Sequence, residues 1–178
     1  MSDNIYLGNP NLKRANVAQE FTQEQILEFY ACRNDPIYFA EKYVKIVSLD
    51  EGLTPFKPYH FQKKLIKNFH ENRFNICKMP RQTGKSTTCV AYLLHYVAFN
   101  DSVNVGILAN KAATARELLG RLQTAYENLP KWMQQGIIAW NRGSLELENG
   151  SKILAASTSA SAVRGMSFNI LFLDEFAF

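Results

Sequence analysis

The sequence contains few cysteines, and their arrangement argues against two kinds of small protein. Cys32, Cys77 and Cys89 are the three cysteines among 178 residues, and they lie far apart in the chain. An odd number without metal-ligand spacing argues against a disulfide framework and against a zinc site. We therefore expect reduced, partly buried thiols in a protein of the cytosol.

The sequence also lacks a long apolar run, a secretory signal, an internal repeat and a low-complexity segment. The longest apolar stretch, residues 89–99, is too short to span a bilayer and contains His95. The formal net charge of +4 is too small by itself to indicate nucleic acid binding. With 47% hydrophobic and 20% charged residues, the composition is that of a globular protein, and the length suits one domain with a sizeable core.

What the sequence does contain is a phosphate-binding pattern at residues 79–87. Gly84 would let backbone N–H groups approach phosphates, Lys85 would neutralise the β and γ oxygens, and the Ser86 hydroxyl could bind Mg²⁺. The full pattern requires a glycine at position 79, where this chain has methionine. A helix start without any ligand therefore stays open as an alternative.

Capping residues and periodicity predict the helices. A capping box at Thr22 predicts a helix from about residue 23, and Asp35 followed by Pro36 predicts a second. Apolar periodicity predicts further helices over three ranges: 58–72, 86–99 and 111–126. Residues 48–56 and 157–167 are expected to form loops, and residues 1–20 a flexible N-terminal arm.

Apolar runs predict the strands. Residues 74–79, 103–109 and 170–173 read as buried strands, and their alternation with helices predicts an α/β fold with a parallel sheet flanked by helices. Residues 144–148 and 152–156 stand on either side of an Asn-Gly turn. They predict an antiparallel hairpin, which we expect at an edge of the sheet.

The last apolar run leads directly into Asp174 and Glu175. Ligands of parallel sheets bind beyond the carboxyl ends of the strands, so these acids and the phosphate loop are expected on the same rim. Asp174 would then reach Mg²⁺ directly or through water, and Glu175 would activate or orient the attacking water. An acidic pair here can also be a simple helix cap, but together with the loop it favours ATP hydrolysis.

Three further polar residues are candidates of lower specificity. Arg81 lies inside the loop and could place a donor near the γ-phosphate, although a surface arginine in a tight turn is an alternative. Arg164, eleven residues before Glu175, could face a neighbouring subunit, but a solvated loop arginine is the simpler interpretation. Gln62, judged alone, reads as a solvated glutamine on a helix surface.

Taken together, these residues resemble the N-terminal ATPase region of large terminase subunits, most closely those of T4-like tailed bacteriophages. The resemblance extends from about residue 21 to the end of the chain. It rests on an ordered set: residues 35–40, Gln62, Arg81 to Ser86, Val163 to Gly165, and Leu173 to Glu175. A loop that begins with Arg-Gln in place of a leading glycine is its most specific part, and it accounts for Met79.

The resemblance implies a role for each matched residue. Gln62 would recognise adenine, and Ser86 and Asp174 would hold Mg²⁺. The ATP phosphates would be bound by the loop and the helix start: Arg81, Gln82, Thr83, Gly84, Lys85, Ser86 and Thr87. The catalytic set would be Glu175, Arg81 as a sensor of the γ-phosphate, and Arg164 as a finger that reaches the neighbouring subunit's nucleotide.

The resemblance also implies an architecture and a function. Residues 73–178 would form a P-loop ATPase core of the ASCE, or RecA-like, class, behind a helical subdomain at residues 21–72. The core would use ATP and Mg²⁺ to drive double-stranded DNA into a viral procapsid. Its partners would be the DNA, the portal protein, the small terminase subunit and further copies in a ring, without a membrane. It would act in the host cytoplasm at the portal vertex and be absent from the mature virion.

The sequence departs from the family at its C-terminus. Members continue with a Ser/Thr-rich coupling motif and an RNase H-like nuclease domain, whereas this chain stops three residues after Glu175. In this class of ATPase, the strand after the acidic one lies between it and the phosphate-loop strand. We therefore expect a sheet that is incomplete at the C-terminus, without the nuclease domain, in a truncated, split or partial gene product.

Two alternatives stay open. A superfamily 2 helicase would use a similar glutamine, loop and acidic pair, and a second RecA-like domain would distinguish it. A non-catalytic module could bind nucleotide or a partner without turnover.

One predicted helix carries three lysines, Lys63, Lys64 and Lys67, which could touch DNA, although a solvated helix face is the simpler interpretation.

Overall fold

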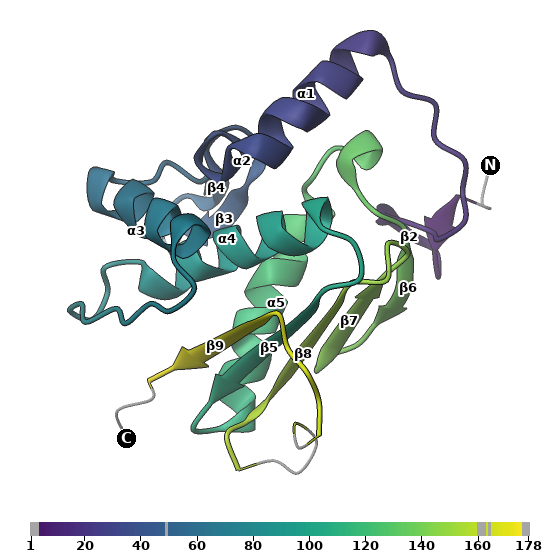
Figure 1. The fold of residues 1–178 in the computed structure, drawn as a ribbon. Helices are drawn as coiled ribbons and strands as arrows, with labels where there is room; N and C mark the ends of the chain where they lie inside the picture. Colours follow the sequence, from purple (N-terminus) through teal and green to yellow (C-terminus); the bar gives the residue numbers. More distant parts are fainter. Residues whose placement is uncertain (1–3, 49, 160–162, 164, 176–178) are drawn as a thin grey trace.

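The computed structural model describes residues 4–48, 50–159, 163 and 165–175 (Figure 1). The strands are β1 (Ile5–Tyr6), β2 (Asn9–Lys13), β3 (Lys45–Ser48), β4 (Gly52–Pro55), β5 (Asn104–Ala109), β6 (Ile137–Trp140), β7 (Ser144–Leu147), β8 (Lys152–Ser157) and β9 (Ile170–Asp174). The helices are α1 (Gln23–Asn34), α2 (Pro36–Tyr43), α3 (His60–Glu71), α4 (Lys85–Phe99) and α5 (Ala112–Glu127), with a short 3₁₀ helix at Lys131–Met133.

A five-stranded mixed sheet has the order β6-β7-β8-β5-β9. β8, β5 and β9 run parallel, whereas β6 and β7 are antiparallel to their neighbours. Ala109 of β5 is in register with Ser157 on one side and with Asp174 on the other. The three parallel strands therefore end level, and the residues that follow them share one rim of the sheet.

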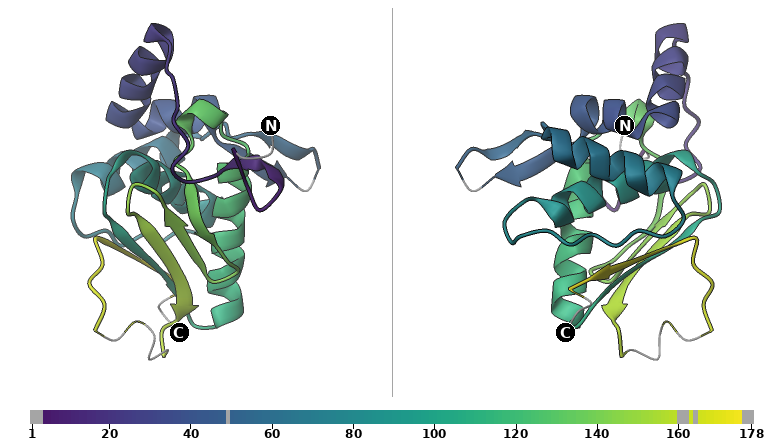
Figure 2. Two further views of the ribbon diagram at one scale, coloured as in Figure 1. Left: turned by 90° about the vertical axis from the view of Figure 1, so that its right-hand side faces the viewer. Right: turned by 60° about the vertical axis from the view of Figure 1, so that its left-hand side comes forward.

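Helix α4 is buried on nearly all sides. From Thr88 to Phe99 every residue except Tyr96 is buried. α2, α3 and α5 all pack against this helix, and α5 in turn covers β5 and β8 (Figures 1 and 2). The sequence predicted a single core face for this helix, but a helix with neighbours around it buries its whole circumference.

The two capping predictions are confirmed. Thr22 and Gln25 exchange hydrogen bonds, Thr22 N–H to Gln25 Oε1 at 3.1 Å and Gln25 N–H to Thr22 Oγ1 at 3.2 Å, and α1 begins at Gln23. Asp35 Oδ1 accepts from the backbone N–H groups of Ile37 and Tyr38 at 2.8 and 3.0 Å. Two of the unpaired N–H groups at the start of α2 are thereby satisfied.

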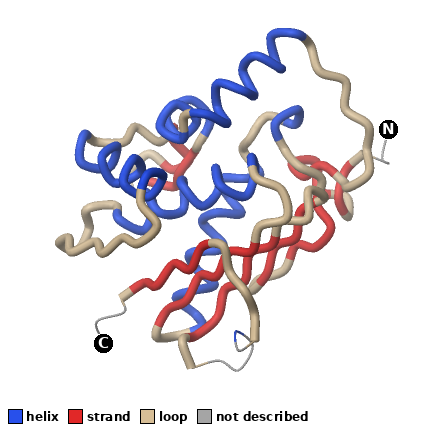
Figure 3. Tube along the Cα trace, viewed as in Figure 1, coloured by secondary structure: helices blue, strands red, loops and turns tan. Residues whose placement is uncertain are grey.

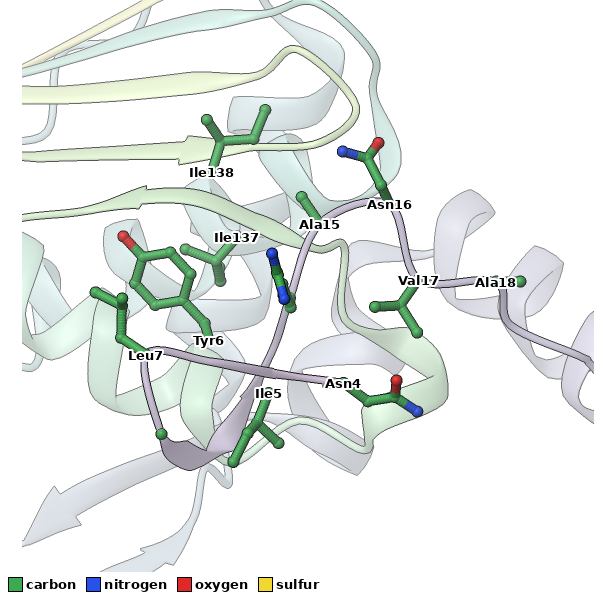
Figure 4. A pocket seen from close by; sticks show the side chains of 12 residues that line it. Asn4, Ile5, Tyr6, Leu7, Ala15, Asn16, Val17, Ala18, Ile137 and Ile138 are labelled. Carbon is green, nitrogen blue, oxygen red and sulfur yellow. The ribbon is translucent and has the colours of Figure 1, made fainter. Parts of the chain in front are cut away.

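Residues 4–18, which we call the N-terminal segment, contain the hairpin β1–β2, where a flexible arm was expected. Leu12 is only 1% exposed, and Gln134 accepts from Lys13 N–H at 3.1 Å and donates to Asn11 O at 3.0 Å. Farther along, Glu148 accepts from Asn16 N–H at 2.9 Å. Figure 4 shows this segment running beside Ile137 and Ile138 of β6, where the two line an open groove.

The run from Phe74 to Met79 was predicted to be a buried strand, and this is wrong. Its side chains are exposed from Phe74 to Lys78, with Ile76 99% exposed, and Figure 3 shows the run as loop. β9 forms the adjacent edge of the sheet, yet no hydrogen bond between described residues joins the run to it. An apolar sequence becomes a strand only where a neighbour takes up its backbone groups, and here none does.

Three further differences concern strands. A loop was expected at residues 48–56, but this range contains the end of β3 and all of β4, which form a hairpin. Val47 and Leu53 face each other across the hairpin and are exposed. β6 was not predicted, and it takes the sheet edge that was expected for the hairpin of β7 and β8. β8 itself lies inside the sheet because it also pairs with β5.

Among the described residues, no helix is long and apolar enough to cross a membrane.

Candidate nucleotide-binding site

The loop before α4 is a tight turn around one carbonyl group. Pro80 O accepts from Thr83 Oγ1 at 3.0 Å and from Lys85 Nζ at 3.1 Å, and Lys85 Nζ also lies 3.5 Å from Met79 O. Gln82 and Gly84 have positive φ angles of 60° and 74°. The turn folds the Lys85 ammonium back over the loop, which places a positive charge in the space that the loop surrounds.

Helix α4 starts from this loop without a side-chain cap. Gly84 is the N-cap residue, and its carbonyl oxygen accepts from both Thr88 N–H and Thr88 Oγ1 at 2.9 Å. The N–H groups of Lys85, Ser86 and Thr87 lie in the first turn, where an α-helix offers no internal acceptor. Such N–H groups, together with the positive end of the helix dipole, bind anions.

The acidic pair lies at the same end of the molecule. Asp174 is the last residue of β9, and Figures 1 and 2 place this strand end near the loop that precedes α4. Burial and the charge of Glu175 raise the pKa of Asp174, and Lys85 partly opposes this rise. Burial also raises the pKa of Cys89 on α4, with a contribution from Asp174. The start of α4 and the end of β9 therefore lie within electrostatic reach of each other.

For the remaining predicted residues, the structure gives exposure and backbone angles but no side-chain contact with the loop or with Asp174 among the described residues. Glu175 is exposed and has a φ of 51°, so the chain turns sharply directly after β9. Arg81 is exposed in the loop, and no ion pair among the described residues involves it. Arg164 lies outside the described residues. The roles assigned to these three residues stay predictions.

Gln62 differs from the solvated surface residue that its type suggests. It is 4% exposed, its Oε1 accepts from Tyr59 N–H at 2.8 Å, and its Nε2 donates to Thr83 O at 3.3 Å. A Cβ atom added to Gly84 would lie 2.5 Å from Gln62 Nε2. The side chain thus touches the phosphate loop itself, and its expected contact with adenine stays a prediction.

Two features of the site were not foreseen. Thr88 closes the first turn of α4 through its hydroxyl, a bond that a threonine four residues after a glycine N-cap could have suggested. Tyr59 and Phe61, at the start of α3, stack with ring centroids 5.8 Å apart and are both exposed. No periodicity in the sequence indicates that pair, because it depends on the angle at which the chain enters α3.

The residues at this site suit a nucleotide with its magnesium ion. The described residues hold no group of three or more His, Cys, Asp or Glu side chains that could bind a metal by themselves. Magnesium in nucleotide sites needs only one or two protein ligands, because the phosphates and water complete its shell. Free N–H groups for phosphate, an ammonium group and one half-buried carboxyl group are the corresponding set.

Comparisons with known proteins identify a matching family and a similar fold. Residues 76–178, more than half of the chain, match the family described as the N-terminal part of the terminase large subunit of T4-like virus type. The fold is similar to the crystal structure of the HK97 bacteriophage large terminase, with a TM-score of 0.64 over 79% of this chain. The sequence identity is 19%, so this likeness concerns the fold alone, and this chain spans 30% of the length of that protein.

Proposed function

Because this chain belongs to the T4-like family of large terminase subunits, we propose that it binds and hydrolyses ATP as part of the motor that packages double-stranded DNA into a viral procapsid. In this proposal, the mixed α/β fold is a P-loop ATPase core. The family resemblance seen in the sequence is thereby confirmed over residues 76–178, whereas the activity is our inference.

One observation carries the proposal. The uncapped start of α4 and the end of β9 lie within electrostatic reach of each other, with Lys85 on one side and Asp174 on the other. Backbone N–H groups and an ammonium group recognise a phosphate, whereas a carboxyl group repels it unless a cation lies between them. An anion and a divalent cation bound together account for both sets of groups.

The site residues then have the following tasks. The N–H groups of α4 and the Lys85 ammonium bind the phosphates of ATP, and Ser86 and Asp174 are the residues that would hold Mg²⁺. When bound with ATP, the ion would supply positive charge against the charge that develops on the phosphates. Glu175 orients the attacking water and accepts its proton.

The neighbouring residues support these tasks. Gln82, Thr83, Gly84 and Thr87 shape the phosphate cradle. Arg81 contacts the γ-phosphate within the same subunit. For Arg164 we keep the proposal from the family resemblance, a contact with the nucleotide of the adjacent subunit in a ring of copies.

The partners follow from the family. We propose double-stranded DNA as the substrate of the motor, the portal protein as its docking partner and the small terminase subunit as its companion. The protein would act in the host cytoplasm at the portal vertex during packaging, and would not remain in the mature virion.

The first experiment is a titration of this chain with Mg²⁺-ATP. Lys85→Ala should weaken the affinity at least about tenfold, because it removes the charge nearest the phosphates. Lys64→Ala is the matched control, since Lys64 is an exposed lysine on α3. This variant should bind Mg²⁺-ATP with the affinity of the wild type. Equal affinities for all three proteins would show that the loop does not bind ATP.

A binding module without turnover remains the second candidate, and one observation favours it. In the described part of the chain β9 is an edge strand, and the run from Phe74 to Met79 lies outside the sheet. No described strand therefore supports Glu175 on that side. Nucleotide binding without release of inorganic phosphate would support this candidate. Release of phosphate that Glu175→Gln abolishes would support hydrolysis.

A further inference from the structure

We propose that Asn110, the residue that follows β5, is a positioning residue for Glu175 in ATP hydrolysis. The inference deepens the proposed function and rests on it, because it assigns a support to the residue that orients the attacking water. It starts from the register of two parallel strands and from what lies on either side of Glu175.

The register places Asn110 beside Glu175. Ala109 of β5 and Asp174 of β9 are the last pair of the ladder, and Asn110 and Glu175 are the next residues of the two chains. Neighbouring parallel strands lie about 4.8 Å apart, so the backbones of Asn110 and Glu175 leave the sheet side by side. Both residues are exposed at this rim.

The backbone of Asn110 is fixed on both sides. Ala109 is 1% exposed, and its carbonyl oxygen accepts from Thr158 N–H at 3.0 Å, which ties the end of β5 to the residue after β8. Lys111 is already the N-cap of α5, and its carbonyl oxygen accepts from Thr114 N–H at 3.1 Å. A residue held between a strand end and a helix start is suited to position another side chain.

Glu175 needs its support from the side of β5. It is exposed, and its φ of 51° turns the chain away from the extended conformation of β9. Among the described residues, no strand lies on the other side of β9. β5 is therefore the described strand beside Glu175, and Asn110 is its first residue beyond the sheet.

An asparagine suits this task chemically. Its N–H groups donate to carboxylate oxygens, and its carbonyl oxygen accepts from water. A cation in the same place would favour the charged carboxylate and make it a weaker base, whereas a second acid would repel it. A neutral amide orients the carboxylate and leaves it able to accept the proton of the attacking water.

A role in starting α5 is the simpler alternative. Asn110 precedes the N-cap Lys111 by one position, and that cap makes no side-chain hydrogen bond. For this alternative, replacing Asn110 should lower the midpoint of thermal unfolding and leave the turnover of the folded protein unchanged.

Turnover and affinity separate the two roles. We would measure phosphate release at saturating Mg²⁺-ATP and the affinity for ATP in the wild type, Asn110→Ala and Asn110→Ser. For a positioning residue, Asn110→Ala should lower kcat about tenfold and change the affinity by less than about twofold, because Glu175 acts in the transition state. Serine keeps a short donor and should recover part of the loss. A wild-type kcat in Asn110→Ala would overturn the proposal.

The pH profile is a readout that a purely structural role would not move. Asn110→Asp adds a second carboxylate beside Glu175, which makes the loss of a proton from Glu175 less favourable. The acid limb of the kcat profile should move to higher pH by about half a pH unit or more. Asn141→Asp is the matched control, since Asn141 is exposed directly after β6 at the opposite edge of the sheet. An acid limb that stays in place in Asn110→Asp would also overturn the proposal.

A cross-link tests the placement of the two residues without nucleotide. Asn110→Cys and Glu175→Cys are combined with Cys77→Ser, which removes the exposed native thiol. Mild oxidation should join the new pair, because a disulfide spans Cα atoms about 4.4–6.8 Å apart, as on adjacent strands. Ser157→Cys with Glu175→Cys is the control, since Ser157 pairs with β5 from its far side, and this pair should stay reduced.

The outcomes separate this inference from the proposed function. A wild type that releases no phosphate would refute hydrolysis by this chain, whatever the cross-link shows. A wild type that releases phosphate, together with an Asn110–Glu175 cysteine pair that stays reduced, would refute the inference alone.

Discussion

The positive charge of Lys85 at the start of α4 favours the ionised form of the Asp174 carboxyl group at the end of β9. Burial and the neighbouring Glu175 raise the pKa of Asp174, and Lys85 lowers it in part. The two residues are 89 positions apart in the sequence, and the level ends of the parallel strands bring Asp174 to the rim that the loop approaches. A bound cation would relieve the charge repulsion between Asp174 and Glu175.

Asp174→Asn should therefore weaken the binding of Mg²⁺ in the complex with ATP. We expect the Mg²⁺ concentration needed for half-maximal ATP binding to rise about tenfold or more, because one charged ligand is lost. The measurement is an ATP titration at stepped Mg²⁺ concentrations, with excess EDTA as the metal-free limit. Asp101→Asn changes an exposed aspartate before β5 and should behave as the wild type does. An unaltered Mg²⁺ requirement would remove Asp174 from the metal site.

Asp35→Ala should destabilise the helical part of the chain. The side chain caps α2 by accepting from two backbone N–H groups, and loss of such a cap costs about 1 kcal/mol. Denaturation with urea, followed by circular dichroism, would report the change in the free energy of unfolding. Asp50→Ala, in the exposed turn between β3 and β4, should change this value by less than about 0.5 kcal/mol. Equal effects of both changes would argue against the cap.

The stability of the fold should depend on pH through His95. The residue is 2% exposed, its Nε2 bonds to Cys32 O at 2.9 Å, and burial lowers its pKa to about 4. The unfolded chain therefore binds a proton at a higher pH than the folded chain does. Stability should be complete above about pH 6.5 and fall as the pH drops toward 4, by about 3 kcal/mol in total.

His95→Phe tests this assignment. Phenylalanine fits among the neighbouring rings of Phe39 and Phe99 and cannot take up a proton. The slope of stability against pH between 6.5 and 4 should decrease by about one proton relative to the wild type. His60→Phe, at the exposed start of α3, should keep the slope of the wild type. A slope that stays the same in His95→Phe would assign the pH dependence to other groups.

Glu148→Ala should release the N-terminal segment from the sheet. The carboxylate accepts from Gly136 N–H at 2.6 Å and Asn16 N–H at 2.9 Å, and it pairs with Lys13 Nζ at 3.3 Å. Burial raises the pKa of Glu148, but these three donors outweigh it and hold the pKa below its usual value. Trypsin should cleave after Arg14 several-fold faster in the variant. Glu146→Ala breaks only the exposed pair with Lys152, so cleavage should stay at the wild-type rate.

Two glycine-to-alanine changes should have opposite signs. At Gly106 of β5, a Cβ would lie 2.8 Å from Leu171 Cδ1 and 3.1 Å from Phe168 Cε1, so Gly106→Ala should cost about 1 kcal/mol by pushing β9 outward. At Gly120 of α5 nothing lies within 4 Å, so Gly120→Ala should stabilise the fold by about 0.5–1 kcal/mol. Thermal unfolding of both variants checks the contrast. A stabilising Gly106→Ala would show that β9 does not pack as described.

The parts of the fold that local sequence determines were predictable. The caps at Thr22 and Asp35 depend on residues within three positions, and both appear as expected. Strands β5 and β9 follow from their apolar runs. The rule about the carboxyl ends of parallel strands accounts for Asp174, because β9 ends level with β5 and β8. It does not account for Lys85, because the run before the phosphate loop is not a strand of the sheet.

The parts that depend on distant partners were not predictable. Residues 74–79 have the composition of a strand, but a strand also requires a neighbour. The hairpin β1–β2 is held by Gln134 and Glu148, more than 100 residues away, and nothing in residues 1–20 indicates them. Gln62 looks like a surface residue on its own helix, because the partner that buries it, Thr83, lies 21 positions farther along.

The attachment of the N-terminal segment to Glu148 also has a consequence during synthesis on the ribosome. Asn16 and Glu148 are 132 positions apart, so the segment is made first and its anchor much later. At about 5–20 residues per second, Asn16 waits roughly 7–26 seconds before Glu148 is even translated. During that interval α1, α2 and α4 can already pack together, while the first strands of the chain remain without their place in the fold. The beginning of this chain therefore reaches its place in the fold only after residues far along the sequence have been made.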